Sequence, residues 1–185
     1  RSPVAHAKLN SINIDEALKC EGVHAVYCGR DTDAFLPCGW ETPTRTGTPP
    51  MAEPPWPLFA QEKIRFVGEI IAVVIAESIN QAKDASEYIQ YDYEELEAVV
   101  SPEKALNANS NLIWDNIPNN QCFDWELGDK EMTDKAFNDA TFTASIELLN
   151  NRLVPNAMEP RSYIGSYDKG KDEYTLYTTT QLPHI

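Results

Sequence analysis

The chain has 185 residues, which is enough for one large domain or two small domains with a buried core. Its formal net charge of −14, without any cluster of Lys or Arg, excludes a nucleic-acid-binding protein, because phosphate binding needs a basic face. No run approaches the ~18 consecutive apolar residues of a membrane helix, so we expect neither nucleic acid nor membrane as a partner.

The four cysteines are too far apart for a zinc site, because no CxxC pair and no comb of Cys and His occurs. They are Cys20, Cys28, Cys38 and Cys122. This usage favours reduced thiols, and therefore a cytoplasmic protein. The chain opens and closes abruptly inside strand-like sequence, so we expect it to be a fragment of a longer polypeptide.

The first thirty residues predict a strand, a short helix and a second strand. The first strand is Ser2–Leu9. Asn13 is a typical N-cap for the helix, with Glu16 at the third helical position, and Gly22 ends it. Val23–Gly29 then alternates as a strand does. Residues 31–61 contain seven prolines, so we expect a long irregular loop, whose large apolar residues pack on the domain.

Residues 63–100 predict a strand–helix–strand unit. Lys63–Glu77 contains a continuous apolar run, which indicates one central strand buried on both faces. Ser78 and Gln81 form a capping box for the next helix, and Tyr91–Val100 returns as a strand. Ser101 is expected to cap a further helical turn that starts with a proline.

The second half predicts antiparallel β-structure after a boundary near residue 115. A short helix is expected at 133–140, followed by a long strand at Thr141–Val154. Two further strands, 162–168 and 173–180, are expected to form a hairpin. Gly165–Asp172 is similar to a phosphate-binding loop, but it lacks the hydroxyl residue and the helix, so ordinary hairpin residues are the better interpretation.

Catalytic patterns are weak along the whole chain. The acidic run with Glu94, Glu95 and Glu97 is best interpreted as a solvated edge, although paired carboxylates leave a hydrolase open. His6 and His24 lie in strand-like sequence, where a satisfied structural imidazole is expected.

The stretch Asn150–Arg161 breaks a strand with two prolines, and both preceding residues are biased toward extended geometry. Glu159 and Arg161 are two residues apart, so in an extended chain they face the same side and could pair. We therefore interpret this stretch as a rigid structural corner.

Five motifs, taken together, go further. They are RSPVAHAKL, VGEIIAVVIAE with the helix NQAKDASEYI, YDYEELEAVV, ELLNNRLVPNAMEPR and LYTTTQLPH. In this order they resemble the large, molybdopterin-binding subunit of the xanthine dehydrogenase, aldehyde oxidase and carbon monoxide dehydrogenase family. The resemblance implies an α+β fold, with an α/β hammerhead domain at 1–115 that lacks its first strand or strands. Residues 116–185 would be the truncated, β-rich beginning of the molybdopterin-binding domain.

The resemblance also implies function. Gln181 matches the family glutamine whose amide hydrogen-bonds an oxygen ligand of the molybdenum, while Glu159 and Arg161 would hold the entry corner. The intact enzyme would oxidise or hydroxylate a purine or other N-heterocycle, an aldehyde or carbon monoxide, with water as oxygen source. Electrons would pass to an Fe–S subunit and an FAD subunit, and the heterotrimer would dimerise. The fragment alone is expected to bind no cofactor and to be inactive. A stand-alone hammerhead module that only binds partners is the alternative.

Overall fold

The computed structural model describes residues 1–34, 51–52, 54–124, 126–151 and 153–180. The chain forms two compact units, residues 1–128 and 129–185, and each is described by itself. Across the described residues, every helix is too short or too polar to cross a membrane.

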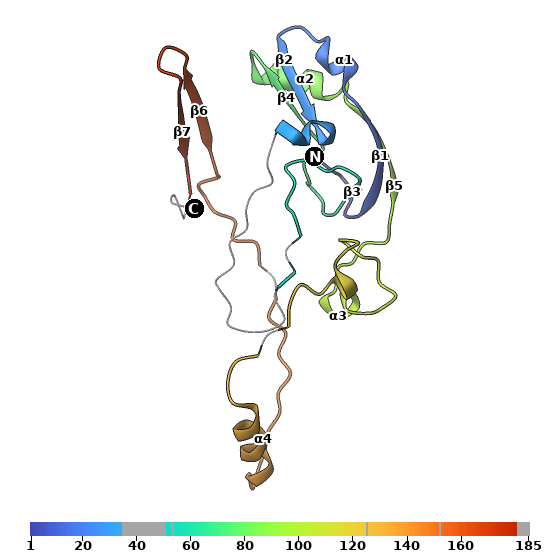
Figure 1. Ribbon diagram of the computed structural model, residues 1–185, viewed down its shortest axis with the longest axis vertical. Coiled ribbons are helices and arrows are strands. Elements are labelled where there is room, and N and C mark those ends of the chain that lie inside the picture. The colour runs from blue at the N-terminus through green and yellow to red at the C-terminus, as the bar shows by residue number, and fades with distance from the viewer. Residues whose placement is uncertain (35–50, 53, 125, 152, 181–185) are drawn as a thin grey trace. The chain divides into compact units, whose positions relative to one another are not determined.

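A three-stranded antiparallel sheet forms one of the two parts of unit 1 (Figure 1). Strand β1 (Ala7–Asn13) lies between β3 (Lys63–Ile64) and β5 (Gln90–Glu95), with Ala7 opposite both Ile64 and Glu95. One face of this sheet packs on a buried cluster of apolar side chains, namely Ala7, Leu9, Ala60, Ile64 and Ile71. Burial alternates at the start of β1 because successive side chains of a strand point to opposite faces.

A two-stranded sheet, with two helices beside it, forms the second core of unit 1. Strands β2 (Val23–Cys28) and β4 (Ala72–Ala76) pair antiparallel, and helices α1 (Asp15–Leu18) and α2 (Ile79–Ser86) contact them. The buried side chains here are Ile14, Ala17, Val26 and Cys28. A 3-10 segment, η1 (Gly29–Ala34), follows β2.

The local signals at the ends of these elements are mostly confirmed. The Ser78 hydroxyl accepts a hydrogen bond from the Gln81 amide at 3.3 Å and donates one to the Gln81 side chain at 2.7 Å. Gly22 adopts φ +78, which only glycine tolerates easily. The expected cap at Asn13 is displaced by one residue, because Ile14 is the N-cap while the Asn13 side chain accepts from the Asp15 amide. The first strand also begins later than expected, at Ala7.

The expectation of one central strand over Lys63–Glu77 is wrong. The segment divides into β3 and β4, which lie in different sheets, and the chain turns at Gly68 with φ +88. Strand β4 is not buried on both faces, since Val73 is 38% exposed. Because β4 and β5 belong to different sheets, the strand–helix–strand unit is not a parallel βαβ unit. A continuous apolar run cannot distinguish one buried strand from two short strands that serve two cores.

The rest of unit 1 is a folded loop region. Helix α3 (Pro102–Ala105) is capped by Ser101 as expected, and a 3-10 turn, η2 (Pro118–Asn120), follows it. Of the proline-rich loop, residues 35–50 and 53 lie outside the described residues. Its last part does pack on the domain, since Phe59 and Ala60 are fully buried.

Unit 2 contains a helix and a hairpin. Helix α4 (Lys130–Asp139) is capped by Asp129, and β6 (Tyr163–Asp168) pairs antiparallel with β7 (Glu173–Thr178). The Asp168 carboxylate accepts a hydrogen bond from the Gly170 amide, so the hairpin interpretation of this turn is confirmed. Every described residue of unit 2 is exposed. The expected strand over Thr141–Val154 is wrong, because the described residues of that range carry no strand and pair with none.

Candidate functional site

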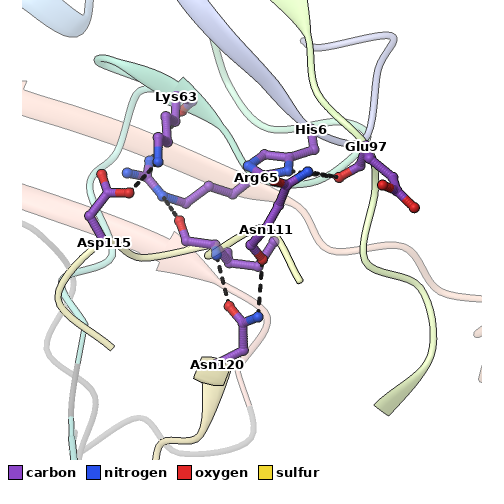
Figure 2. Close-up of polar contacts among 8 residues, drawn as sticks. His6, Lys63, Arg65, Glu97, Asn111, Asp115 and Asn120 are labelled. Atoms are coloured by element: carbon purple, nitrogen blue, oxygen red, sulfur yellow. Dashed lines mark hydrogen bonds and ion pairs between the residues drawn. The ribbon is translucent and has the colours of Figure 1, made fainter. Parts of the chain in front are cut away.

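Arg65, directly after β3, fastens a distant loop to the three-stranded sheet (Figure 2). We call residues 107–121 the connector. The guanidinium Nε of Arg65 donates to the carbonyl of Ile113 at 3.2 Å, and Nη1 donates to the carbonyl of Lys63 at 3.1 Å. Its Cζ lies 3.7 Å from the centroid of the Trp114 ring, which is cation–π geometry. One side chain therefore makes a hydrogen bond and a ring contact to adjacent connector residues.

A buried carboxylate, that of Glu69, holds the backbone of Arg65 in place. Glu69 is 6% exposed, and its Oε2 accepts a hydrogen bond from the Arg65 amide at 2.5 Å. Burial raises the pKa of the Glu69 carboxyl, while the nearby guanidinium opposes that shift. Burial likewise lowers the pKa of Arg65, but a guanidinium stays protonated in proteins. The site thus contains a permanent, partly desolvated cation beside a protonatable carboxyl.

A second contact joins the same strand to the connector. Lys63 Nζ lies 2.5 Å from Asp115 Oδ1, and this hydrogen bond lowers the pKa of the Asp115 carboxyl. The Asp115 side chain is 74% exposed, so solvent screens the pair. It therefore stabilises the connector less than Arg65 does.

Two asparagines hold the connector in its folded form. The side-chain Oδ1 of Asn120 accepts a hydrogen bond from the Ile113 backbone amide at 2.8 Å, and its Nδ2 donates to the backbone carbonyls of Ala105 and Asn111. Asn120 has φ +54, a left-handed conformation that asparagine adopts more readily than most residues. The side-chain Nδ2 of Asn111 donates to the backbone carbonyl of Glu97 at 3.2 Å, and Glu97 lies two residues after the end of β5.

The same Glu97 carbonyl is also contacted by His6, the residue directly before β1. His6 is 2% exposed, and its Nδ1 lies 3.2 Å from that oxygen. Because a carbonyl only accepts, Nδ1 carries the proton in this contact. Nε2 is buried and has no hydrogen-bond partner among the described residues. His6 is thus a buried structural imidazole, but only one of its ring nitrogens is hydrogen-bonded among the described residues, so it is not the fully satisfied imidazole that was expected. The same expectation is wrong for His24, which is exposed.

The cluster can bind and position chain segments, but its described residues offer little for catalysis. No group of three or more His, Cys, Asp or Glu side chains in the described part could hold a metal ion. Among the described cysteines, Cys20, Cys28 and Cys122 are free thiols. Glu94, Glu95 and Glu97 are all exposed, which fits the solvated edge that the sequence favours over a hydrolase.

The site residues expected from the sequence lie elsewhere. Gln181 is outside the described residues. Glu159 and Arg161 are exposed, and no ion pair joins them among the interactions of the described residues. Their role as a structural corner stays a prediction. Sequence reasoning did not find Arg65 and Trp114, since residues so far apart carry no shared local signal.

The comparisons with known proteins cover the whole chain. A family model described as "Aldehyde oxidase and xanthine dehydrogenase, a/b hammerhead domain" matches residues 1–97, and one described as "Molybdopterin cofactor-binding domain" matches residues 113–185. The carbon monoxide dehydrogenase large chain of Hydrogenophaga pseudoflava is 31% identical over 197 residues, covering 100% of this chain and 24% of the relative. The chain therefore spans about a quarter of the length of such a curated relative.

Solved structures agree with these matches. Reconstituted carbon monoxide dehydrogenase from Oligotropha carboxidovorans is similar with a TM-score of 0.82 and 30% identity, covering 100% of this chain and 23% of that chain. Quinoline 2-oxidoreductase from Pseudomonas putida 86 is similar with a TM-score of 0.81 and 32% identity, covering 99% of this chain and 23% of that chain.

Proposed function

Because the chain belongs to the aldehyde oxidase and xanthine dehydrogenase family, we propose that it is part of the large subunit of a molybdenum hydroxylase. The resemblance found in the sequence and the α+β fold class are both confirmed: the chain carries an α/β hammerhead domain and the start of a molybdopterin cofactor-binding domain. We place the boundary between these domains at residues 115 and 116. The support is approximate: the first family match ends at residue 97 and the second begins at residue 113, three residues before the proposed boundary.

The observation that carries the proposal is the contrast between the two units. Unit 1 has two buried clusters of its own, whereas every described residue of unit 2 is exposed. A folded domain must bury apolar surface to offset the conformational entropy of its chain. Unit 2 therefore needs further polypeptide to complete a core, as the beginning of a larger cofactor-binding domain would.

The intact enzyme, on this proposal, oxidises or hydroxylates a small substrate with water as oxygen source. The molybdenum cofactor supplies the oxidising centre when bound, and electrons leave through an Fe–S subunit and an FAD subunit of a dimerising heterotrimer. The substrate is a purine or other N-heterocycle, an aldehyde or carbon monoxide. Two of these classes have support in the names of similar proteins, which include a carbon monoxide dehydrogenase and a quinoline oxidoreductase.

The described residues of this chain do not themselves fit a metal site, so we derive no catalytic step from them. The one residue proposed to act near the cofactor is Gln181, whose amide would donate a hydrogen bond to an oxygen on the bound group without adding charge. Glu159 and Arg161 are proposed to hold the corner that leads toward it. The free thiols of the described cysteines support the proposed cytoplasmic location.

The test is to express the longer polypeptide encoded by the gene, together with its partner subunits, and to measure its molybdenum and pterin content. We expect a loaded enzyme that oxidises carbon monoxide, an aldehyde or an N-heterocycle with an artificial electron acceptor. The 185-residue chain alone should acquire neither molybdenum nor activity. Turnover by the chain alone would contradict the proposal.

Gln181→Ala tests the residue assignment within that enzyme. We expect the variant to lose most of its turnover but to keep its metal, whereas Gln121→Ala, at an exposed position of unit 1, keeps both. If both variants keep full turnover, the assignment of Gln181 is wrong. If the coding region ended at Ile185, the alternative of a non-catalytic hammerhead module would replace the proposal.

A further inference from the structure

The connector is attached to the rest of unit 1 mainly by side chains, not by strand pairing. Residues 107–121 contain only the short η2 turn, and the described residues show no ladder between the connector and either sheet. Its Ile117 side chain is nevertheless buried, with 4% exposure. Something other than a strand must therefore hold this segment in one place.

Arg65 is the side chain best placed to do so. It reaches the connector at two adjacent residues, through the Ile113 carbonyl and the Trp114 ring, while its own position is set by the Lys63 carbonyl and by Glu69. The guanidinium is half-buried, and a desolvated cation interacts more strongly with a carbonyl and a ring face than an exposed one. In the Lys63–Asp115 pair next to it, the Asp115 side chain is 74% exposed, so solvent screens the interaction and the pair contributes less.

We propose that Arg65 is a positioning residue that clamps the connector to the end of β3, so that the chain leaves the hammerhead domain from a fixed point. The clamp is the set of contacts from Arg65 to Ile113 and Trp114. Without it, the connector is joined to the strand that ends at Ile64 through the weaker Lys63–Asp115 pair, and the hydrogen bonds within the connector open more often. This inference concerns the folding of unit 1 and holds whichever substrate the intact protein uses.

The planar guanidinium explains why lysine at this position is not equivalent. It lies against the Trp114 ring while Nε and Nη1 donate to two different carbonyls. A lysine keeps the charge but presents one flexible ammonium, and a glutamine keeps a donor but loses the charge. A comparison of arginine, lysine and glutamine at position 65 therefore distinguishes the contribution of the positive charge from that of the planar shape.

Hydrogen exchange on the 185-residue chain tests the clamp. The reporters are the connector amides that the structure shows hydrogen-bonded, namely those of Ile113, Ile117, Asn120 and Gln121. The paired amides of β2 and β4 serve as the internal reference. We expect Arg65→Ala to accelerate exchange at the connector about tenfold to hundredfold, with little change in the reference.

Conservative variants at position 65 test whether the charge and the shape of the guanidinium are both needed. We expect Arg65→Lys to restore part of the protection and Arg65→Gln to restore almost none. Asp115→Ala, which removes the ion pair with Lys63 at a side chain that is 74% exposed, should change connector exchange by less than about threefold. Unchanged connector exchange in Arg65→Ala, or equal protection by Gln and Lys, would overturn the proposal.

Trp114→Ala decides the matter if Arg65→Ala accelerates exchange throughout unit 1. This variant removes the ring from the far side of the contact and leaves the sheet and its core unaltered. Faster exchange confined to the connector supports the clamp. A connector that remains protected without the ring overturns it.

Discussion

Truncation of one side chain in each unit should separate the unit that has buried clusters from the unit whose described residues are all exposed. Ile64 is fully buried in the three-stranded half of unit 1, beside Leu9 and Ile71. Leu149, in unit 2, is 88% exposed. Both are large aliphatic residues, so Ile64→Ala and Leu149→Ala remove comparable apolar volume from very different surroundings.

The expected costs differ because only one of these truncations leaves a cavity. Ile64→Ala loses the transfer free energy of its buried methylene and methyl groups and also leaves an unfilled space, which together cost about 2–5 kcal/mol. Leu149→Ala removes atoms that already contact water in this chain, so we expect a change within about 0.5 kcal/mol. In the longer polypeptide, where we propose that Leu149 is buried, the same change should cost about 2–5 kcal/mol.

Urea unfolding followed by circular dichroism gives the free energy of unfolding of each variant in each polypeptide. Within each polypeptide, the loss of unfolding free energy caused by Leu149→Ala is divided by the loss caused by Ile64→Ala, each measured against the wild type of the same length. The two ratios, one for the 185-residue chain and one for the longer polypeptide, are then compared. If Leu149→Ala were as costly as Ile64→Ala in the 185-residue chain, unit 2 would have its own core. The reasoning from exposed residues to missing polypeptide would then be refuted.

Three further outcomes are expected in unit 1. Burial raises the pKa of Glu69 above its ordinary value of 4.5, so its contribution to stability is fully present below that pH and is lost as pH rises through the raised pKa. Urea unfolding at several values between about pH 4 and about pH 8 gives the free energy of unfolding of the wild type and of Glu69→Gln. As the pH rises, the wild-type value should fall relative to the value for Glu69→Gln. A difference that stays constant with pH would contradict this. Ser78→Ala should cost about 1 kcal/mol and accelerate exchange in α2, because it removes the acceptor for the Gln81 amide. Gly22→Ala should lower the thermal midpoint by the equivalent of at least about 1–2 kcal/mol, because a side chain is forced into φ +78 and its Cβ would also lie too close to Gln81 Nε2. Gly165→Ala in β6, where a Cβ meets nothing within 4 Å, should change the midpoint little, and equal shifts would show that neither the left-handed conformation nor this close approach matters.

Signals that depend on a few neighbouring residues were predictable from the sequence. The Ser78 and Ser101 caps, the Gly22 turn and the Asp168 hairpin each rest on contacts within about four residues, and all four are present. Their physics is local, so the surrounding fold has little power to override them.

Sheet membership was less predictable, because pairing depends on partners elsewhere in the chain. The apolar run Ile70–Ala76 indicates burial, but it carries no information on whether one strand or two supply it. In the structure Ile64 and Ile71 enter one core while Val74 packs on the other, and Gly68 makes the division possible.

The contacts of the clamp were beyond sequence reasoning for the same reason. An arginine in a strand and a tryptophan in a polar loop are each ordinary when taken alone. Only the fold shows that Arg65 lies over Trp114 and that Glu69 supports it. By contrast, Gln181 came from resemblance and lies outside the described residues, while Glu159 and Arg161 came first from their spacing, and no ion pair joins them among the described residues.

The one strand that sequence reasoning expected and the structure lacks is informative about function. Thr141–Val154 has the composition of a strand, and its Ile146, Leu148 and Leu153 are more than three-quarters exposed. A strand forms when its backbone groups find a partner and its apolar face finds a core, and the described residues of unit 2 offer it neither. The same range falls within the match to a molybdopterin cofactor-binding domain. On the function proposed above, this strand-like pattern finds its partner in the rest of that cofactor-binding domain.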